Sequence, residues 1–178
     1  MKALVVYESL YGNTAAIGEA IAASLRSHGL EVEAGSTSKI SPAQTAGFDL
    51  LVVGGPTHAH GMSKKQTRKA AIEDKKNTYA EATAEPGLRE WLTDLPPGAG
   101  RLAAAFDTRI DKAAFLTGSA AKGIARLLEG NGCALIVPPE CFLVTTQNRL
   151  RDGELQHADE WGAELATAIS ASGAGGAA

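Results

Sequence analysis

Near its N-terminus the chain reads Ala3-Leu4-Val5-Val6-Tyr7-Glu8-Ser9-Leu10-Tyr11-Gly12-Asn13-Thr14, an uninterrupted apolar run followed by a polar loop with one glycine. The run Ala3–Tyr7 is typical of a strand buried on both faces of a parallel sheet. A helix is predicted from Thr14 to His28, because apolar residues recur every four positions from Ile17 onward. Asn13 is the expected N-cap of this helix.

The same alternation of short apolar runs and longer amphipathic runs continues along the 178 residues. Further strands are predicted at 30–34, 49–53, 102–106 and 134–145, and further helices at 88–95, after a cap at Ser119, and at 155–169. Parallel neighbours need crossover connections, so the pattern predicts an α/β fold with a doubly wound five-stranded parallel sheet and helices on both faces. Pro138 and Pro139 have no N–H to donate to a neighbouring strand, so the last strand is expected at an edge of the sheet. The strand order 2-1-3-4-5 places it there as well.

Residues 64–86 interrupt this alternation and are interpreted as a polar insertion. Positive charges crowd into its first half, at Lys64, Lys65, Arg68, Lys69, Lys75 and Lys76. A solvated surface is the favoured interpretation of such a run. The alternative is that Lys64–Lys76 docks an acidic partner. Residues 1–170 are expected to form one domain, followed by a disordered tail at 171–178.

Composition excludes several classes of function. The net charge of −3 gives no electrostatic reason to expect nucleic acid as a partner. No apolar run is long enough to span a bilayer, so no membrane association is expected. The two cysteines, Cys133 and Cys141, suggest a reducing, cytoplasmic compartment, although a single disulfide stays open.

The loop Ser9–Thr14 has the groups of an anion site. It combines hydroxyls, an amide and backbone N–H groups with the start of a helix, where N–H groups lack intrahelical partners. The loop holds no lysine or arginine, which suits a phosphate monoester better than a triphosphate with magnesium. The G-x-x-x-x-G-K-[ST] and G-x-G-x-x-G patterns are both absent from it. A capped turn without a ligand is the structural alternative.

The stretch Tyr7–Thr14 resembles the phosphate loop of the flavodoxins, which reads Ser or Thr, any residue, Thr, Ser or Tyr, then Gly-Asn-Thr. The resemblance extends to residues 54–61 and 106–119, which lie where this family has its two ring-binding loops. It implies a flavodoxin-like fold and one flavin mononucleotide (FMN). The residues implied at the phosphate are Ser9, Leu10, Tyr11, Gly12, Asn13 and Thr14. Those implied at the ring are Pro56, Thr57, His58, Ala59, Gly61, Thr108, Arg109 and Thr117.

The ring loops depart from the family pattern, because His58 and His60 stand where many flavodoxins have a large stacking side chain. Two histidines alone are too few for a metal site. The resemblance implies an electron carrier that passes electrons between a reductase and an acceptor protein. One alternative is an FMN-dependent NAD(P)H:quinone oxidoreductase, since Pro56-Thr57 and Gly61-Met62 resemble a loop of quinone reductases that share this fold. The other is a flavin-free module that only binds a partner.

Overall fold

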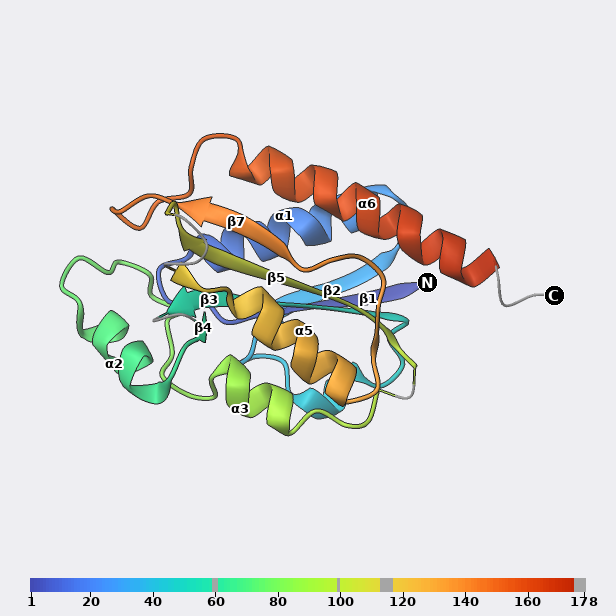
Figure 1. Ribbon diagram of the computed structural model, residues 1–178, viewed down its shortest axis with the longest axis horizontal. Helices are drawn as coiled ribbons and strands as arrows, with labels where there is room; N and C mark the ends of the chain where they lie inside the picture. The colour runs from blue at the N-terminus through green and yellow to red at the C-terminus, as the bar shows by residue number, and fades with distance from the viewer. Residues whose placement is uncertain (59–60, 99, 113–116, 175–178) are drawn as a thin grey trace.

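The computed structural model describes residues 1–58, 61–98, 100–112 and 117–174, and its centre is one twisted sheet (Figure 1). Five strands follow the order β2-β1-β3-β5-β6, and each pairs in parallel with its neighbours. Their bounds are β1 (Lys2–Tyr7), β2 (Glu31–Ser36), β3 (Leu50–His58), β5 (Leu102–Ile110) and β6 (Ala134–Leu135). This arrangement confirms the predicted doubly wound sheet. It also confirms the order 2-1-3-4-5, in which β5 and β6 are the fourth and fifth strands.

The predicted single strand at 134–145 is wrong, because the edge of the sheet is built from two short strands. β6 is followed by a gap at 136–139 and then by β7 (Glu140–Val144), and both pair with β5. Pro138 and Pro139 lie in the gap and cannot donate to β5. The pairing moves from Ala103↔Leu135 to Phe106↔Glu140, an offset of two residues that keeps alternate side chains on their original faces.

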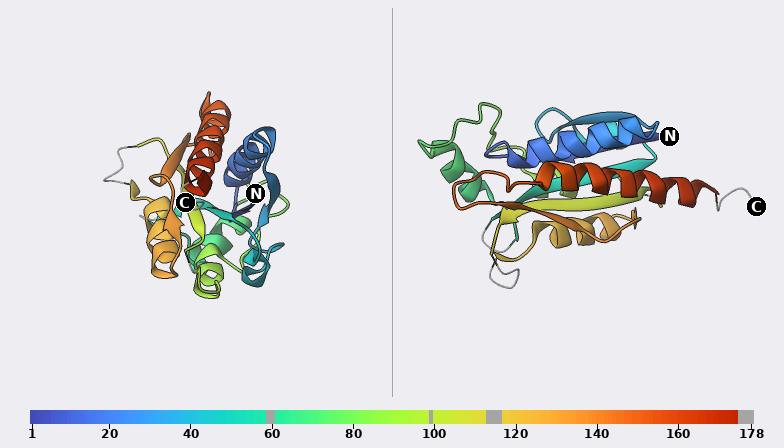
Figure 2. Two further views of the ribbon diagram at one scale, coloured as in Figure 1. Left: turned by 90° about the vertical axis from the view of Figure 1, so that its right-hand side faces the viewer. Right: turned by 90° about the horizontal axis from the view of Figure 1, so that it is seen from above.

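Helices cover both faces of the sheet (Figure 2). On one face lie α1 (Asn13–Ser27) and α6 (Glu154–Ala174), which pack against each other and against Val5, Val52 and Phe106. On the other face lie α3 (Leu88–Thr93) and α5 (Ala120–Gly130), which pack on Val6, Val53 and Ala105. Because successive strand residues point to opposite faces, the apolar runs in β1, β3 and β5 serve both layers.

Two predicted helix ends differ from the structure. The N-cap of α1 is Gly12, in the left-handed conformation at φ 86, rather than Asn13, which is the first helical residue. At the other end of the chain, α6 continues to Ala174, five residues beyond the predicted helix end at 169. Residues 175–178 lie outside the described residues. Ser119 does cap α5, and its hydroxyl accepts a bond from the N–H of Lys122, as predicted.

The segment 64–86 contains α2 (Lys65–Glu73) and then runs irregularly back to α3. The sequence interpretation of a solvated surface is wrong for Arg68, whose side chain is fully buried. Its guanidinium donates to Ala84 O at 2.7 Å and to Glu90 Oε1 at 3.0 Å, and it lies 3.9 Å from Glu8 Oε2. Arg68 therefore ties the segment to the end of β1.

The remaining short elements are the 3-10 helix η1 (Pro42–Thr45) and strand β4 (Gly61–Met62), which pairs antiparallel with the end of β3. Both cysteines are free. Among the described residues, no helix combines the length and the apolar character needed to cross a membrane.

Candidate functional site

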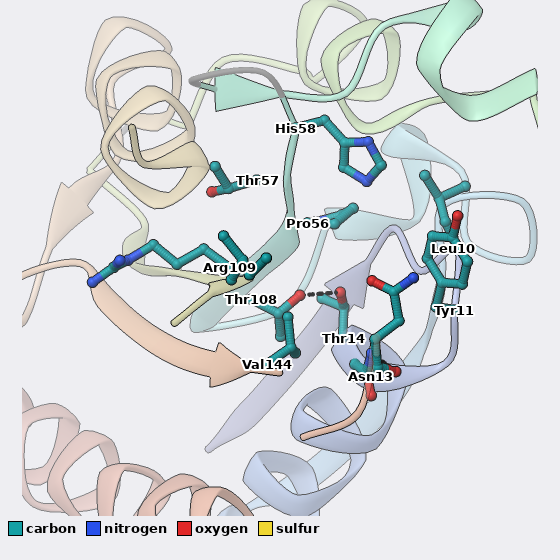
Figure 3. A pocket seen from close by; sticks show the side chains of 12 residues that line it. Leu10, Tyr11, Asn13, Thr14, Pro56, Thr57, His58, Thr108, Arg109 and Val144 are labelled. Carbon is teal, nitrogen blue, oxygen red and sulfur yellow. Dashed lines mark hydrogen bonds between the residues drawn. The ribbon is translucent and has the colours of Figure 1, made fainter. Parts of the chain in front are cut away.

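A cavity of about 310 Å³ lies at the carboxyl ends of β3 and β5, beside the loop that precedes α1 (Figure 3). In doubly wound parallel sheets, ligands bind in this position, beyond the carboxyl ends of the strands and at the point where the strand order reverses. The walls come from four separate stretches of the chain. They are Leu10, Tyr11, Asn13 and Thr14; Pro56, Thr57 and His58; Thr108, Arg109 and Ile110; and Val144 with Asn148.

The loop before α1 is shaped as an anion cradle. Gly12 adopts φ 86, a conformation that glycine accepts at little cost, and no side chain caps the helix that follows. The first N–H groups of α1 are therefore left for a ligand or for solvent. Ser9 is buried, and its hydroxyl oxygen has no hydrogen-bond partner among the described residues. Such an unpaired buried hydroxyl is costly unless a ligand completes it.

Thr14 connects this cradle to the far wall of the cavity. Its Oγ1 lies 2.7 Å from Oγ1 of Thr108 at the end of β5, and both residues are buried. Figure 3 shows the two hydroxyls facing each other across the floor of the cavity. Either oxygen can donate, so the pair can turn one proton toward a bound acceptor.

Residues 74–79 hold the cradle from outside. The amide of Asn77 donates to Leu10 O and to Ala71 O, both at 2.8 Å. The Tyr11 hydroxyl donates to Asp74 Oδ2 at 3.2 Å, and burial raises the pKa of Tyr11. The ring of Tyr79 lies against Gly12, so that a Cβ added to Gly12 would come within 3.1 Å of it.

At the other end of the cavity, a polar network fixes the ends of β3 and β5 against α5. Its centre is Asp107, which is fully buried. Asp107 Oδ2 accepts from Thr57 Oγ1 at 3.0 Å, from Ser119 Oγ at 2.8 Å and from the N–H of Ala121 at 2.9 Å. Thr57 also accepts from the N–H of Ala120 at 2.8 Å. This network makes the Thr57 wall rigid.

Two cation-forming side chains border the same end. Burial lowers the pKa of His58, so its imidazole is neutral near pH 7 and offers a flat apolar surface. The Arg109 guanidinium donates to Lys112 O at 2.7 Å and to Thr117 Oγ1 at 3.3 Å. Figure 3 shows Arg109 extended away from Thr14, toward the Thr57 side of the cavity.

The structure brings together most of the residues that the sequence singled out, although their part in binding stays a prediction. Ser9 and Gly12 lie within the loop without lining the cavity, and Thr117 contacts Arg109. Gly61 lies instead on a neighbouring surface cleft. Ala59 and His60 lie outside the described residues.

Sequence reasoning missed three lining residues, Ile110, Val144 and Asn148. Asn148 is the one non-glycine residue with positive φ among those described, at φ 56, and its carbonyl accepts from Asn13 Nδ2 at 2.9 Å. The signal for it was a turn-rich stretch, Thr145-Thr146-Gln147-Asn148, directly after the last strand. Nothing in that stretch showed that it reaches Asn13.

A second, larger cleft of about 670 Å³ adjoins the cradle and shares Tyr11 and Asn148 with the cavity. Lys76 and Arg149 are among the residues that line it. The described residues contain no group of three or more histidine, cysteine or acidic side chains that could hold a metal ion. Burial, with Asp107 nearby, raises the pKa of the Cys141 thiol, so this cysteine is not a reactive thiolate.

No family model matches the chain, and no curated protein matches it. Solved structures do match along nearly its whole length. A flavodoxin from the domain Archaea is 21% identical with a TM-score of 0.67, covering 96% of this chain and 99% of its own. The chain has the flavodoxin fold. Oxidised flavodoxin 1 from Bacillus cereus is 15% identical with a TM-score of 0.67, covering 94% and 98%. A WrbA-like flavodoxin from Agrobacterium tumefaciens is 19% identical with a TM-score of 0.59, covering 95% and 97%.

Proposed function

We propose that this protein binds FMN in the cavity and carries electrons between a reductase and an acceptor protein. The observation that carries the proposal is the cradle at Ser9–Thr14, which holds an uncapped helix start and the unpaired buried hydroxyl of Ser9. Four residues of this loop, Leu10, Tyr11, Asn13 and Thr14, line one end of the cavity. Hydroxyls and N–H groups without a local cation suit a phosphate monoester. FMN, when bound, would supply the redox chemistry, and the protein would supply binding, orientation and electrostatics.

The rest of the cavity fits a flat ring with a polar edge. Leu10, Pro56, Ile110 and Val144 supply apolar surface, and the neutral imidazole of His58 supplies a planar one. Arg109 supplies a cation at the Thr57 side, where it would favour negative charge on a bound ring. The cavity volume of about 310 Å³ lies at the lower end of the range for small-molecule sites.

The test of the phosphate assignment is a set of affinities, measured by quenching of flavin fluorescence. Thr14→Ala removes a hydroxyl that would face the phosphate and should weaken FMN binding by about 1.5–3 kcal/mol, or about 10- to 150-fold. Thr14→Ser keeps the hydroxyl and should stay close to wild type. Riboflavin, which lacks the phosphate, should bind weakly to all three proteins.

Equal affinities of riboflavin and FMN for the wild type would contradict the assignment. FAD serves as the second comparison, because the cleft beyond Tyr11 and Asn148 has room for more than a terminal phosphate. We expect FMN to bind more tightly than FAD. Tighter binding of FAD than of FMN would indicate that the adenylate of FAD occupies that cleft.

A second candidate function, an NAD(P)H:quinone oxidoreductase, has one observation in its favour. The two dipeptides that resemble a quinone-reductase loop, Pro56-Thr57 and Gly61-Met62, are joined in the structure by the pairing of Thr57 with Met62. Steady-state oxidation of NADH or NADPH with a soluble quinone separates the two functions. An electron carrier should show negligible turnover without a reductase, whereas an enzyme should turn over repeatedly. We also propose a cytoplasmic location, which agrees with the two free cysteines.

A further inference from the structure

Three cations gather on the face of the molecule that α3 and α5 form. Arg89 comes from α3, and Lys122 and Arg126 come from α5, which packs against both α3 and β4 (Figure 1). All three are exposed, and they line a shallow cleft with Gly61, Met62 and Leu127. We call Arg89, Lys122, Arg126 and Leu127 the α3–α5 surface.

The three cations of the α3–α5 surface form no ion pairs within the described part of the chain. No ion pair found among the described residues includes Arg89, Lys122 or Arg126. Lys122 and Arg126 lie four residues apart on one helix, a spacing at which like charges repel. Leu127 is 38% exposed beside them, which adds an apolar contact to the cationic rim. An apolar centre with a charged rim is typical of a protein-binding surface.

The basic segment 64–76 differs in this respect. Arg68 is buried between Glu8 and Glu90, and Lys65 pairs with Glu85. Two of the cations that the sequence suggested for docking, Lys65 and Arg68, therefore form ion pairs within the protein instead. The remaining lysines of this segment are Lys64, Lys69, Lys75 and Lys76, and all four are exposed. Of these, Lys64, Lys69 and Lys75 line neither the cavity nor the cleft that adjoins it, and they provide a comparison of equal charge.

The α3–α5 surface lies close to the Thr57 end of the cavity. Its cleft begins at Gly61 and Met62, which pair with His58 and Thr57. Ser119 also lines the cleft, and its hydroxyl donates to Asp107, the same carboxylate that accepts from Thr57. One strand pair and one hydrogen-bond network thus separate the surface from the cavity wall. A redox centre held on this surface would be near the end of the cavity that Thr57, His58 and Arg109 border.

We propose that the α3–α5 surface docks an acidic redox protein, which exchanges single electrons with the flavin of the proposed function. Complementary charge raises the rate of association and fixes the orientation of a transient complex. The partner must present carboxylates around a small apolar contact that faces Leu127. The proposal rests on the proposed function, and it replaces the expectation that Lys64–Lys76 is the docking site.

The test uses an acidic [2Fe–2S] ferredoxin as the probe and two triple variants of equal charge. The first is Arg89→Gln, Lys122→Gln, Arg126→Gln. The control is Lys64→Gln, Lys69→Gln, Lys75→Gln. Ferredoxin binding is followed by ¹⁵N NMR titration of the protein without added flavin, and reduction of the FMN-loaded protein is followed by stopped-flow absorption. The titration does not depend on flavin, so failure of the FMN proposal and failure of the docking proposal are distinguished.

We expect the wild-type association rate to fall steeply as the salt concentration rises from about 20 to 300 mM, because the Debye length shortens over this range. The first triple variant should associate about tenfold more slowly at low salt and lose most of the salt dependence. The control should stay within about twofold of wild type, with unchanged FMN affinity. A salt-independent wild type, a first variant that behaves like wild type, or an equal loss in the control would each overturn the proposal.

Discussion

Glu8 follows β1 directly and is only 4% exposed. Its Oε2 accepts from the N–H of Leu88 at 2.7 Å, while its Oε1 has no hydrogen-bond partner among the described residues. Burial raises the pKa of Glu8, and the Arg68 guanidinium 3.9 Å away only partly opposes this effect. A charge at this position is therefore costly, and a proton on Glu8 relieves the cost.

The pKa of Glu8 gives a pH prediction. Because this pKa is higher in the folded protein than in the unfolded chain, the folded protein binds the proton more readily. The contribution of Glu8 favours folding at low pH and is lost as the pH rises through the folded-state pKa. Glu8→Gln removes this titration. Urea unfolding should show wild type gaining free energy of unfolding relative to Glu8→Gln as the pH falls from about 8 to 5.

The control for this prediction is Glu33→Gln, a change of the same type at an exposed position on β2. Its difference from wild type should vary much less over the same range. A constant difference between wild type and Glu8→Gln would show that Glu8 keeps an ordinary pKa in the folded protein.

At the scale of elements, the segment 74–79 supports the cradle at several points. Asn77 bridges Leu10 O and Ala71 O with one amide group, and so links the loop before α1 to the end of α2. Asn77→Ala leaves both carbonyls without this donor, at a cost of about 1–3 kcal/mol. We expect FMN affinity to fall by about tenfold, because the loop loses its outer support.

Thr78→Ala is the matched control for Asn77→Ala, since Thr78 is exposed and is the next residue in the chain. It should leave FMN affinity unchanged. Limited proteolysis adds an independent measurement, because loss of the Asn77 bridge should speed cleavage within 74–87. If Asn77→Ala binds FMN as the wild type does, the segment has no role in shaping the cradle.

The elements also show what the sequence could predict. The apolar runs and the four-residue period from Ile17 predicted the strands and the helix layers, because burial on two faces leaves a direct pattern. The order of the sheet came from known folds of this type, and the edge position expected for Pro138 and Pro139 agreed with it. Arg68 was misinterpreted because a buried arginine and a solvated one look alike in sequence. Asn13 was misplaced by one residue, since Gly12 takes the cap conformation itself.

The cavity was predictable only in part for a related reason. The loop Ser9–Thr14 comes shortly after β1, and Pro56–His58 form the end of β3, so the fold alone brings both to one edge of the sheet. Val144 ends β7, whose pairing with β5 is displaced by two residues from that of β6, and Asn148 lies in the turn after it. That displacement depends on tertiary packing, and no local pattern records it.

At the scale of the whole molecule, the two edges of the sheet have different structures. The β2 edge carries exposed Glu31 and Glu33, and the opposite edge is interrupted at Pro138 and Pro139. Replacing the two prolines with Thr and Val, respectively, restores donors and allows a longer edge strand. We expect this double variant to form thioflavin-positive assemblies faster at high concentration, with FMN affinity retained.

Pro96 and Pro97 provide the matched control, because this second proline pair lies in a connection between α3 and β5 and outside any strand. The same Thr and Val changes there should leave assembly unchanged. Equal assembly rates for wild type and the Pro138 and Pro139 variant would show that the interruption at 136–139 does not protect this edge.

The interrupted edge has a further consequence for how the protein exists at high concentration. If the chain carries electrons as proposed, it must bind each partner briefly and release it, and a sheet that recruited other strands would instead hold the protein in permanent aggregates. The β2 edge of the sheet carries carboxylates, and the opposite edge is interrupted and lacks the N–H donors of two prolines. The backbone therefore offers little template for fibril growth. Contacts with the proposed partners would then be made by side chains rather than by strand pairing.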